Sequence, residues 1–233
     1  MSDQRTEFLG ALLALMPVPE LHGPNLIVGI DGVDGVDGSG KTRLADELAA
    51  RMPESSPVVR VSIDGFHHVR EKRYRRGPRS PEGFWLDSYD YEQFRQEVID
   101  PFRSGRGTYL SAGHDVDSDR LLSGPRRDVQ QGSILLVDGI FLHRPELVDV
   151  WDLTVFLDVP FMESVRRMSV RDGLPGDPDA EENTRYVGGQ KLYLSECRPA
   201  DRATIHVDYR HLDRPRIRRA ARQPAHQRHR EGT

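Results

Sequence analysis

The chain has 233 residues, of which 36% are hydrophobic and 30% charged, an ordinary composition for one globular domain. It contains no apolar run of the roughly 18 residues that a membrane span requires, and its first residues lack the profile of a secretory signal, so we expect a cytoplasmic protein without membrane contact. The single cysteine, Cys197, excludes an internal disulfide framework and suits a reducing compartment.

The net charge of −4 is unevenly distributed, because residues 210–233 hold eight arginines and only two acidic residues. Few apolar residues follow Ile217, which predicts a basic, disordered tail. A nucleic-acid-binding arm is the alternative, but no aromatic residues are interleaved with the arginines. We therefore expect no nucleic-acid partner.

Taken in chain order, the hydrophobic pattern predicts helices that alternate with short apolar strands. A helix over residues 3–16 ends before Pro17, and the strand Leu26–Ile30 follows. This alternation favours an α/β fold with a mainly parallel sheet covered on both faces, in a single domain over residues 1–209. The other predicted strands are Val58–Ile63, Ile134–Val137, Leu153–Val159 and Thr204–Val207, and the other predicted helices cover about 43–52, 91–102, 161–171 and 184–197.

The run GVDGVDGSGKT, from Gly32 to Thr42, lies between the first strand and a helical segment. In this context the pattern predicts a phosphate-binding loop, in which Lys41 reaches the β- and γ-phosphates and the Thr42 hydroxyl binds Mg²⁺. An ordinary glycine-rich turn is the alternative. We expect ATP or GTP with Mg²⁺ as cofactors, held by Gly35, Asp37, Gly38, Ser39, Gly40, Lys41 and Thr42.

The triplet Gly32-Val33-Asp34 is repeated as Gly35-Val36-Asp37, as though three residues had been inserted between strand and loop. Sliding the strand by three positions would turn its core-facing side chains to the opposite face of the sheet. We therefore expect a local bulge before a loop that is complete from Gly35.

Two further apolar strands end in an Asp-Gly pair, at Asp64 and at Asp138. Ligands of parallel sheets collect at the carboxyl ends of the strands, where Asp64 can accept a proton from an attacking hydroxyl and Asp138 can hold the Mg²⁺ shell. A turn or a cap is the alternative role for an aspartate at a strand end. Two such residues behind a phosphate-binding loop favour the functional role.

From about Leu26 to Tyr209 the chain resembles the uridine kinase family of P-loop kinases. The segment Ser62–His67 is similar to the family segment that carries the catalytic base, which implies that role for Asp64. Leu86–Asp90 is similar to the segment that binds the ribose hydroxyls, which points to Asp87. Tyr109 and His114 have the spacing of a tyrosine and a histidine that contact the pyrimidine base, and Val137–Phe141 resembles the strand end with the metal-shell acid.

The segment Arg166–Asp172 resembles the helix that leads into the mobile lid of this family. The resemblance implies a lid over about 171–185, with Arg167 and Arg171 stabilising the transferred phosphoryl group. The acidic residues and prolines of residues 173–183 depart from the arginine-rich lid of better-known members. A solvated helix face is the alternative for Arg167, as are a core position for Tyr109 and a surface loop for His114.

The motifs and the resemblance together imply a P-loop NTPase fold of three α/β/α layers and a nucleoside kinase that phosphorylates the 5′-hydroxyl of uridine or cytidine. One alternative is a kinase of the same architecture that acts on pantothenate, a sugar or a glycerate-like acid. Another is a nucleotide-binding protein without catalytic activity. The expected partner is a small molecule, and a homo-oligomer is compatible with the sequence.

Overall fold

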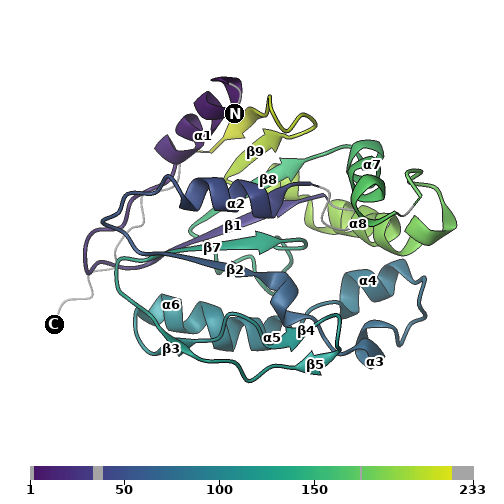
Figure 1. Cartoon of the computed structure of the whole chain (residues 1–233), viewed down its shortest axis with the longest axis horizontal. Coiled ribbons are helices and arrows are strands. Elements are labelled where there is room, and N and C mark those ends of the chain that lie inside the picture. Colours follow the sequence, from purple (N-terminus) through teal and green to yellow (C-terminus); the bar gives the residue numbers. More distant parts are fainter. Residues whose placement is uncertain (1–2, 34–38, 174, 222–233) are drawn as a thin grey trace.

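A six-stranded sheet with the strand order β10-β9-β8-β1-β7-β2 forms the centre of the protein (Figure 1). The computed structural model describes residues 3–33, 39–173 and 175–221. Neighbouring strands are parallel except β10, which pairs antiparallel with β9, so the prediction of a mainly parallel sheet is confirmed. The strands are β1 Leu26–Gly32, β2 Val58–Ser62, β7 Ile134–Gly139, β8 Leu153–Asp158, β9 Ile205–Asp208 and β10 Arg216–Ala220.

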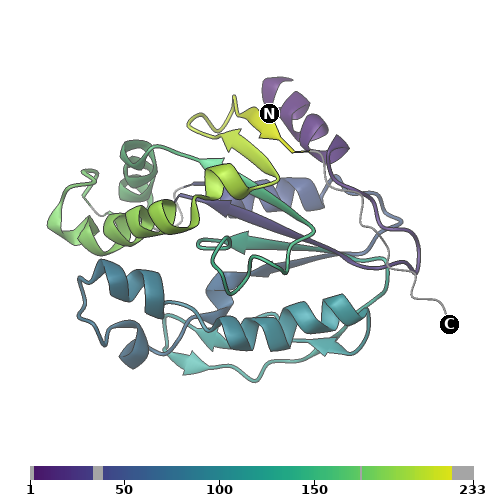
Figure 2. The same ribbon diagram turned by 180° about the vertical axis from the view of Figure 1, so that it is seen from behind.

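Helices cover both faces of the sheet, with α1 and α2 on one side and α5 and α6 on the other (Figures 1 and 2). Within the described ranges, no helix is both long enough and apolar enough to cross a lipid bilayer. The α-helices are α1 Asp3–Ala14, α2 Lys41–Ala49, α3 Arg70–Arg73, α4 Pro81–Asp87, α5 Tyr91–Phe94, α6 Asp100–Ser104, α7 Phe161–Asp172, α8 Thr184–Cys197 and α9 Pro199–Arg202. Short hairpin strands complete the fold: β3 Thr108–Tyr109, β4 His114–Asp115, β5 Arg120–Leu121 and β6 Arg127–Asp128.

The buried strands divide their side chains between two hydrophobic clusters, one on each face of the sheet. In β1, Val28 and Ile30 pack with α1 and α2, whereas Ile27 packs in the cluster that contains α4, α5 and α8. In β7, Leu136 belongs to the first cluster and Leu135 to the second. Because successive strand side chains point to opposite faces, an apolar run of this kind requires a cover on both sides.

The helix predicted to stop near Pro101 continues to Ser104. A π-helical turn, Arg95–Ile99, joins α5 to α6, and Pro101 occupies the first turn of α6, where its missing N–H is tolerated. The basic stretch from Arg70 to Gly83 holds α3 and the start of α4. Ser80 caps α4, because its Oγ accepts the Gly83 N–H at 3.0 Å and Pro81 follows at the first helical position.

The end of β1 includes part of the repeated triplet. Gly32 pairs with Leu157 of β8, and Val33 is buried in the core. A Cβ on Gly32 would lie 3.1 Å from both Leu157 Cβ and Ser39 Oγ, so a side chain at this strand end would crowd its neighbours. Asp34 and the second copy of the triplet lie outside the described residues, so the expected bulge stays a prediction.

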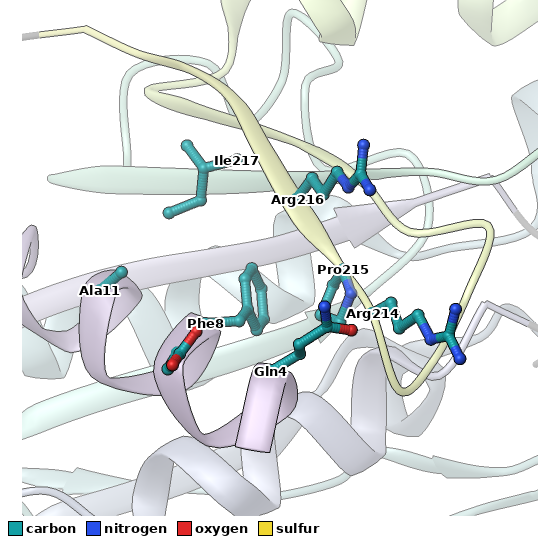
Figure 3. A pocket seen from close by; sticks show the side chains of 8 residues that line it. Gln4, Phe8, Ala11, Arg214, Pro215, Arg216 and Ile217 are labelled. Carbon is teal, nitrogen blue, oxygen red and sulfur yellow. The ribbon is translucent and has the colours of Figure 1, made fainter. Parts of the chain in front are cut away.

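Part of the region predicted as a disordered tail is ordered. Residues 216–220 form β10, in which Ile217 pairs with Val207 and packs against the core. The prediction was wrong here because the segment is highly charged, yet its backbone forms hydrogen bonds to β9 as an antiparallel strand. A hollow of about 320 Å³ separates β10 from α1, with Phe8 and Ile217 among its lining side chains (Figure 3). None of the predicted site residues lines it.

Arg5 joins α1 to the helix that follows the phosphate-binding loop. The guanidinium is fully buried and donates to the Glu47 carboxylate at 2.9 Å and to the Tyr209 hydroxyl at 2.9 Å. It also donates to the Leu212 carbonyl. Burial alone would lower the pKa of Arg5, but the bonds to Glu47 and Tyr209 raise it, so the buried cation is stabilised.

We predict that Arg5→Ala destabilises the protein by about 1–3 kcal/mol, because it leaves buried acceptors without their donor. Urea denaturation measures the free energy of unfolding. Arg43→Ala is the matched control, since Arg43 contacts the same Glu47 at 3.1 Å but is half exposed. We expect the control to cost less than about 0.5 kcal/mol. Equal losses in the two variants would contradict the role assigned to Arg5.

Candidate active site

The register of the parallel strands brings the predicted acidic residues to one edge of the sheet. Asp138 of β7 lies opposite Ile30 of β1 on one side and opposite Ser62 of β2 on the other. Asp64 follows two residues after Ser62, in the 3₁₀ turn Ile63–Phe66. Helices α3, α4, α7 and α8 gather at the same side of the molecule as these strand ends (Figure 1). The arrangement agrees with the rule for ligand sites in α/β sheets.

The described part of the phosphate-binding loop begins at Ser39 and leads directly into α2. Gly40 precedes the helix with φ of 81°, and a Cβ there would lie 3.2 Å from Leu212, so this position favours glycine. Lys41 is nearly buried and donates to Ser39 Oγ at 3.2 Å. Lys41 and Thr42 thus occupy the first turn of α2, where backbone N–H groups attract an anion. Gly35, Asp37 and Gly38 lie outside the described residues.

The predicted Mg²⁺ ligands Thr42 and Asp138 are in contact. Thr42 Oγ1 donates to Asp138 Oδ2 at 2.8 Å, although the two residues are far apart in the chain. The other carboxylate oxygen accepts from Arg60 Nη2 of β2 at 2.7 Å, and Arg60 also pairs with Asp46 of α2. A hydroxyl and a carboxylate beside a helix N-terminus are oxygen donors of the kind Mg²⁺ uses, so the residues present fit the ion.

Asp64 is held by its neighbours in a defined orientation. The Tyr89 hydroxyl donates to Asp64 Oδ1 at 2.6 Å, and the Asp64 N–H donates to Ser62 Oγ at 3.3 Å. The His67 ring packs on Tyr89 with ring centroids 4.4 Å apart, and its Nδ1 lies 2.8 Å from the Asp64 carbonyl oxygen. Burial lowers the pKa of His67, partly offset by the Asp64 charge, so a neutral imidazole is favoured.

Asp87, the predicted ribose ligand, has both carboxylate oxygens occupied by protein groups. Arg75 Nη2 donates to Oδ1 at 2.5 Å, and Arg76 Nε donates to Oδ2 at 2.9 Å. Burial alone would raise the pKa of Asp87, but the bonds from the two arginines lower it, so the carboxylate stays charged in a nearly buried position. In this structure Asp87 therefore orients arginines.

Tyr109 and His114, the predicted contacts to the pyrimidine base, lie in two different environments. Tyr109 in β3 is buried, with its ring centroid 5.1 Å from that of Phe102, and thus takes the core position named as its alternative. His114 in β4 is also buried, and its Nε2 lies 3.2 Å from Asp119 Oδ1. The same oxygen accepts from Arg73 Nη2 at 3.4 Å, and His114 and Arg73 both influence the pKa of His67. His114 thus lies near the Asp64 segment.

The predicted lid arginine Arg167 is anchored within the protein. It donates to Glu163 at 2.8 Å and to the carbonyl oxygen of Arg210 at 2.8 Å. Hydrogen bonds from Arg166 and Arg167 lower the pKa of Glu163 to about 2. A hollow of about 410 Å³ separates α7 from the loop 210–214, whose Leu212 approaches Gly40. The backbone of Arg171 belongs to α7, and its side chain is outside what the structure describes.

A buried network around Asp31 supports the end of β1. Asp31 Oδ2 lies 2.7 Å from His143 Nδ1 and accepts the Tyr193 hydroxyl, while Oδ1 accepts the Gly32 N–H at 2.7 Å. Burial and the Asp31 charge raise the pKa of Tyr193, which keeps it protonated as a donor. The network connects β1 with α8 at the strand end that precedes the phosphate-binding loop.

Sequence reasoning missed Arg60 as a partner of Asp138. Its only local signal was a charged residue that interrupts the apolar strand Val58–Ile63, and the contact depends on the register between β2 and β7. The hydrogen bond from Tyr89 to Asp64 depends on an antiparallel bridge between His67 and Tyr89. Neither contact follows from a motif.

Comparisons with known proteins agree with this architecture. No family model matches the chain. The pantothenate kinase of an Enterobacter species is 29% identical over 173 residues, and that of Photorhabdus laumondii is 26% identical over 170 residues. Both matches cover 66% of this chain and 53% of the relative, so the chain spans about half the length of these curated relatives.

A solved structure described as a possible uridine kinase from Bacillus stearothermophilus superposes with a TM-score of 0.63 at 22% identity. The match covers 88% of this chain and 97% of that chain. The protein thus has the fold of P-loop kinases, with a mainly parallel sheet between helical layers. The comparisons support this broad class and do not single out uridine kinases within it.

We predict that Lys41→Ala weakens the binding of a non-hydrolysable ATP analogue by about tenfold or more, because a nearly buried ammonium beside the loop contributes a charge-assisted contact to the phosphates. Isothermal titration calorimetry measures the affinity. Lys191→Ala, a surface lysine of α8, serves as the control and should leave the affinity unchanged. Unchanged affinity in the Lys41 variant would mean that this loop is not the nucleotide site.

Proposed function

We propose that this protein is a kinase that transfers the γ-phosphoryl group of ATP or GTP to a hydroxyl group of a small metabolite. The observation that carries the proposal is the contact of Thr42 with Asp138 at the start of α2, with Asp64 on the neighbouring strand end. This contact supports a site in which a metal-bound triphosphate lies near Asp64, the proposed base. The fold and the pantothenate kinase relatives support the same class of reaction.

On the donor side, Lys41 and the N–H groups of the first turn of α2 bind the phosphates, and Thr42 and Asp138 hold Mg²⁺. The ion would neutralise charge on the β- and γ-phosphate oxygens. The hollow between α7 and the loop 210–214 lies beside Gly40, and we assign the base of the nucleotide to it. Gly35, Asp37, Gly38, Ser39 and Gly40 complete the proposed loop.

On the acceptor side, Asp64 accepts the proton of the acceptor's hydroxyl group. At the same time the oxygen of that hydroxyl group forms a bond to the γ-phosphorus. The bond between that phosphorus and the bridging oxygen of the leaving diphosphate breaks, and the nucleoside diphosphate departs. Tyr89 orients Asp64 through its hydrogen bond to Oδ1. Arg171, at the start of the proposed lid over about 171–185, remains the proposed source of further positive charge, while Arg167 anchors α7 to the C-terminal loop.

The finer proposal from the sequence is that uridine or cytidine is the acceptor, with His114 as a contact to the base. The resemblance to uridine kinases supports it, and His114 lies in the same cluster as His67 and Arg73. A different hydroxyl compound is the second candidate, favoured by the occupation of Asp87 by two arginines. Pantothenate or a glycerate-like acid would belong to this second class, which the pantothenate kinase relatives also support.

We predict that Asp64→Asn lowers kcat by about 10²–10⁴-fold and leaves nucleotide affinity nearly unchanged, because removal of a general base affects the chemical step. ADP release is measured with Mg²⁺ and ATP against uridine, cytidine, pantothenate and glycerate. The control Asp128→Asn alters an exposed aspartate in β6 and should retain full activity. Retention of more than about a third of kcat in the Asp64 variant would exclude it as the base. Binding of ATP without turnover of any acceptor would favour a non-catalytic nucleotide-binding protein.

A further inference from the structure

The segment from Arg70 to Ser80 is strongly basic in a chain whose net charge is negative. It contains six Lys or Arg residues and one Glu. It consists of α3 and the turn that leads into α4, and both helices lie at the same side of the molecule as β4 and β5 (Figure 1). The proposed function assigns no role to this charge.

Arg75 and Arg76 are the best-oriented cations of the segment. Each gives one N–H group to Asp87, Arg75 through Nη2 and Arg76 through Nε. Their side chains are nevertheless 53% and 40% exposed, whereas that of Asp87 is 2% exposed. A guanidinium has five N–H donors, so each arginine keeps donors that Asp87 does not use. Within the described ranges, Asp87 is the one hydrogen-bonding partner that the structure shows for the side chain of either arginine.

Arg185 at the start of α8 holds this basic segment in place. It is nearly buried, and it donates to the carbonyl oxygens of Arg73 at 2.9 Å and of Ser80 at 3.2 Å. Its guanidinium also lies 4.6 Å from the ring centroid of Tyr74. Contacts on both sides of Arg75 and Arg76 limit the freedom of the loop, which lowers the entropy lost when the arginines bind a ligand.

The arginine pair is coupled to the proposed base through a short segment. Asp87 lies two residues before Tyr89, whose hydroxyl donates to Asp64. The intervening Ser88 accepts the His68 N–H at 2.9 Å, so the Asp64 and Asp87 segments lie side by side. The two arginines therefore bind to a segment that lies beside Asp64, on the proposed acceptor side of the site.

We propose that the acceptor carries an anionic group, a carboxylate or a phosphate ester, and that Arg75 and Arg76 bind it. This inference rests on the proposed kinase function and names the class of its substrate. Two oriented guanidinium groups match the oxygen atoms of a carboxylate or phosphate, and they would place the acceptor hydroxyl toward Asp64. A neutral nucleoside offers no charge to these arginines, and each carboxylate oxygen of Asp87 already accepts a hydrogen bond from one of them.

The test compares acids with neutral counterparts of similar shape. ADP release is measured for glycerate against glycerol, pantothenate against pantothenol, and ribulose 5-phosphate against ribulose, with uridine and cytidine included. The first two pairs probe a carboxylate and the third a phosphate. We expect one acid to exceed its neutral counterpart in kcat/KM by about tenfold or more, because a charge-assisted contact is lost in the neutral compound.

Variants connect that preference to the arginines. Two variants are used: Arg76→Gln and the triple variant Arg75→Gln/Arg76→Gln/Asp87→Asn. The triple variant avoids leaving the buried Asp87 carboxylate unpaired. Both should raise KM for the acid about tenfold or more and leave KM for ATP unchanged. Arg79→Gln is the matched control, because it removes the same charge from the same segment but pairs with Glu181. It should leave KM for the acid unchanged.

The outcomes separate this inference from the proposed function. Equal or better turnover of uridine, cytidine or another neutral compound would overturn the anionic acceptor and leave the kinase function standing. If no compound is phosphorylated, calorimetric titration with the three acids and inorganic phosphate tests anion binding independently of catalysis. Saturable binding that is lost in the triple variant but kept in Arg79→Gln would support it. The absence of saturable binding, or binding unaffected by the triple variant, would overturn it.

Discussion

The hydrogen bond between Thr42 and Asp138 is the contact on which the proposed site depends. It joins the first turn of α2 to the carboxyl end of β7, and it forms because β7 lies between β1 and β2 in the sheet. The parallel register then places Ser62 opposite Asp138, so Asp64 falls on the next strand end. A shift of one residue in that register would turn Asp138 to the other face of the sheet and separate it from Thr42.

The two halves of the site are built in different ways. The donor half uses backbone geometry: a positive φ at Gly40, a helix N-terminus and a strand end. The acceptor half uses side-chain networks, in which carboxylates such as the buried Asp87 and the partly exposed Asp119 orient basic residues. Donor binding is therefore expected to be common to proteins of this fold, whereas acceptor choice depends on a few contacts in the segment between α3 and α4.

The sequence predicted most of the fold, because buried parallel strands such as Ile134–Val137 are continuous apolar runs with acidic residues at their ends. From the rule that ligands collect at strand ends, it also predicted that Asp64 and Asp138 lie close to Thr42 of the phosphate-binding loop. It missed what depends on pairing between distant segments: β10 forms on β9 despite its arginines, and Arg60 pairs with Asp138. The partners of Asp87 were hidden for the same reason, since Arg75 and Arg76 reach it across a turn that no local pattern specifies.

The most direct measurement is the affinity of ATP with and without Mg²⁺ for the wild type and for Asp138→Asn. If Thr42 and Asp138 hold the metal of the bound nucleotide, Mg²⁺ should strengthen ATP binding in the wild type, and the variant should lose about tenfold or more of that gain. Its affinity for ATP without Mg²⁺ should not fall. Asp46→Asn, which alters the other acidic partner of Arg60, is the control and should keep the full gain. An undiminished effect of Mg²⁺ in the Asp138 variant would contradict the site proposed for this protein.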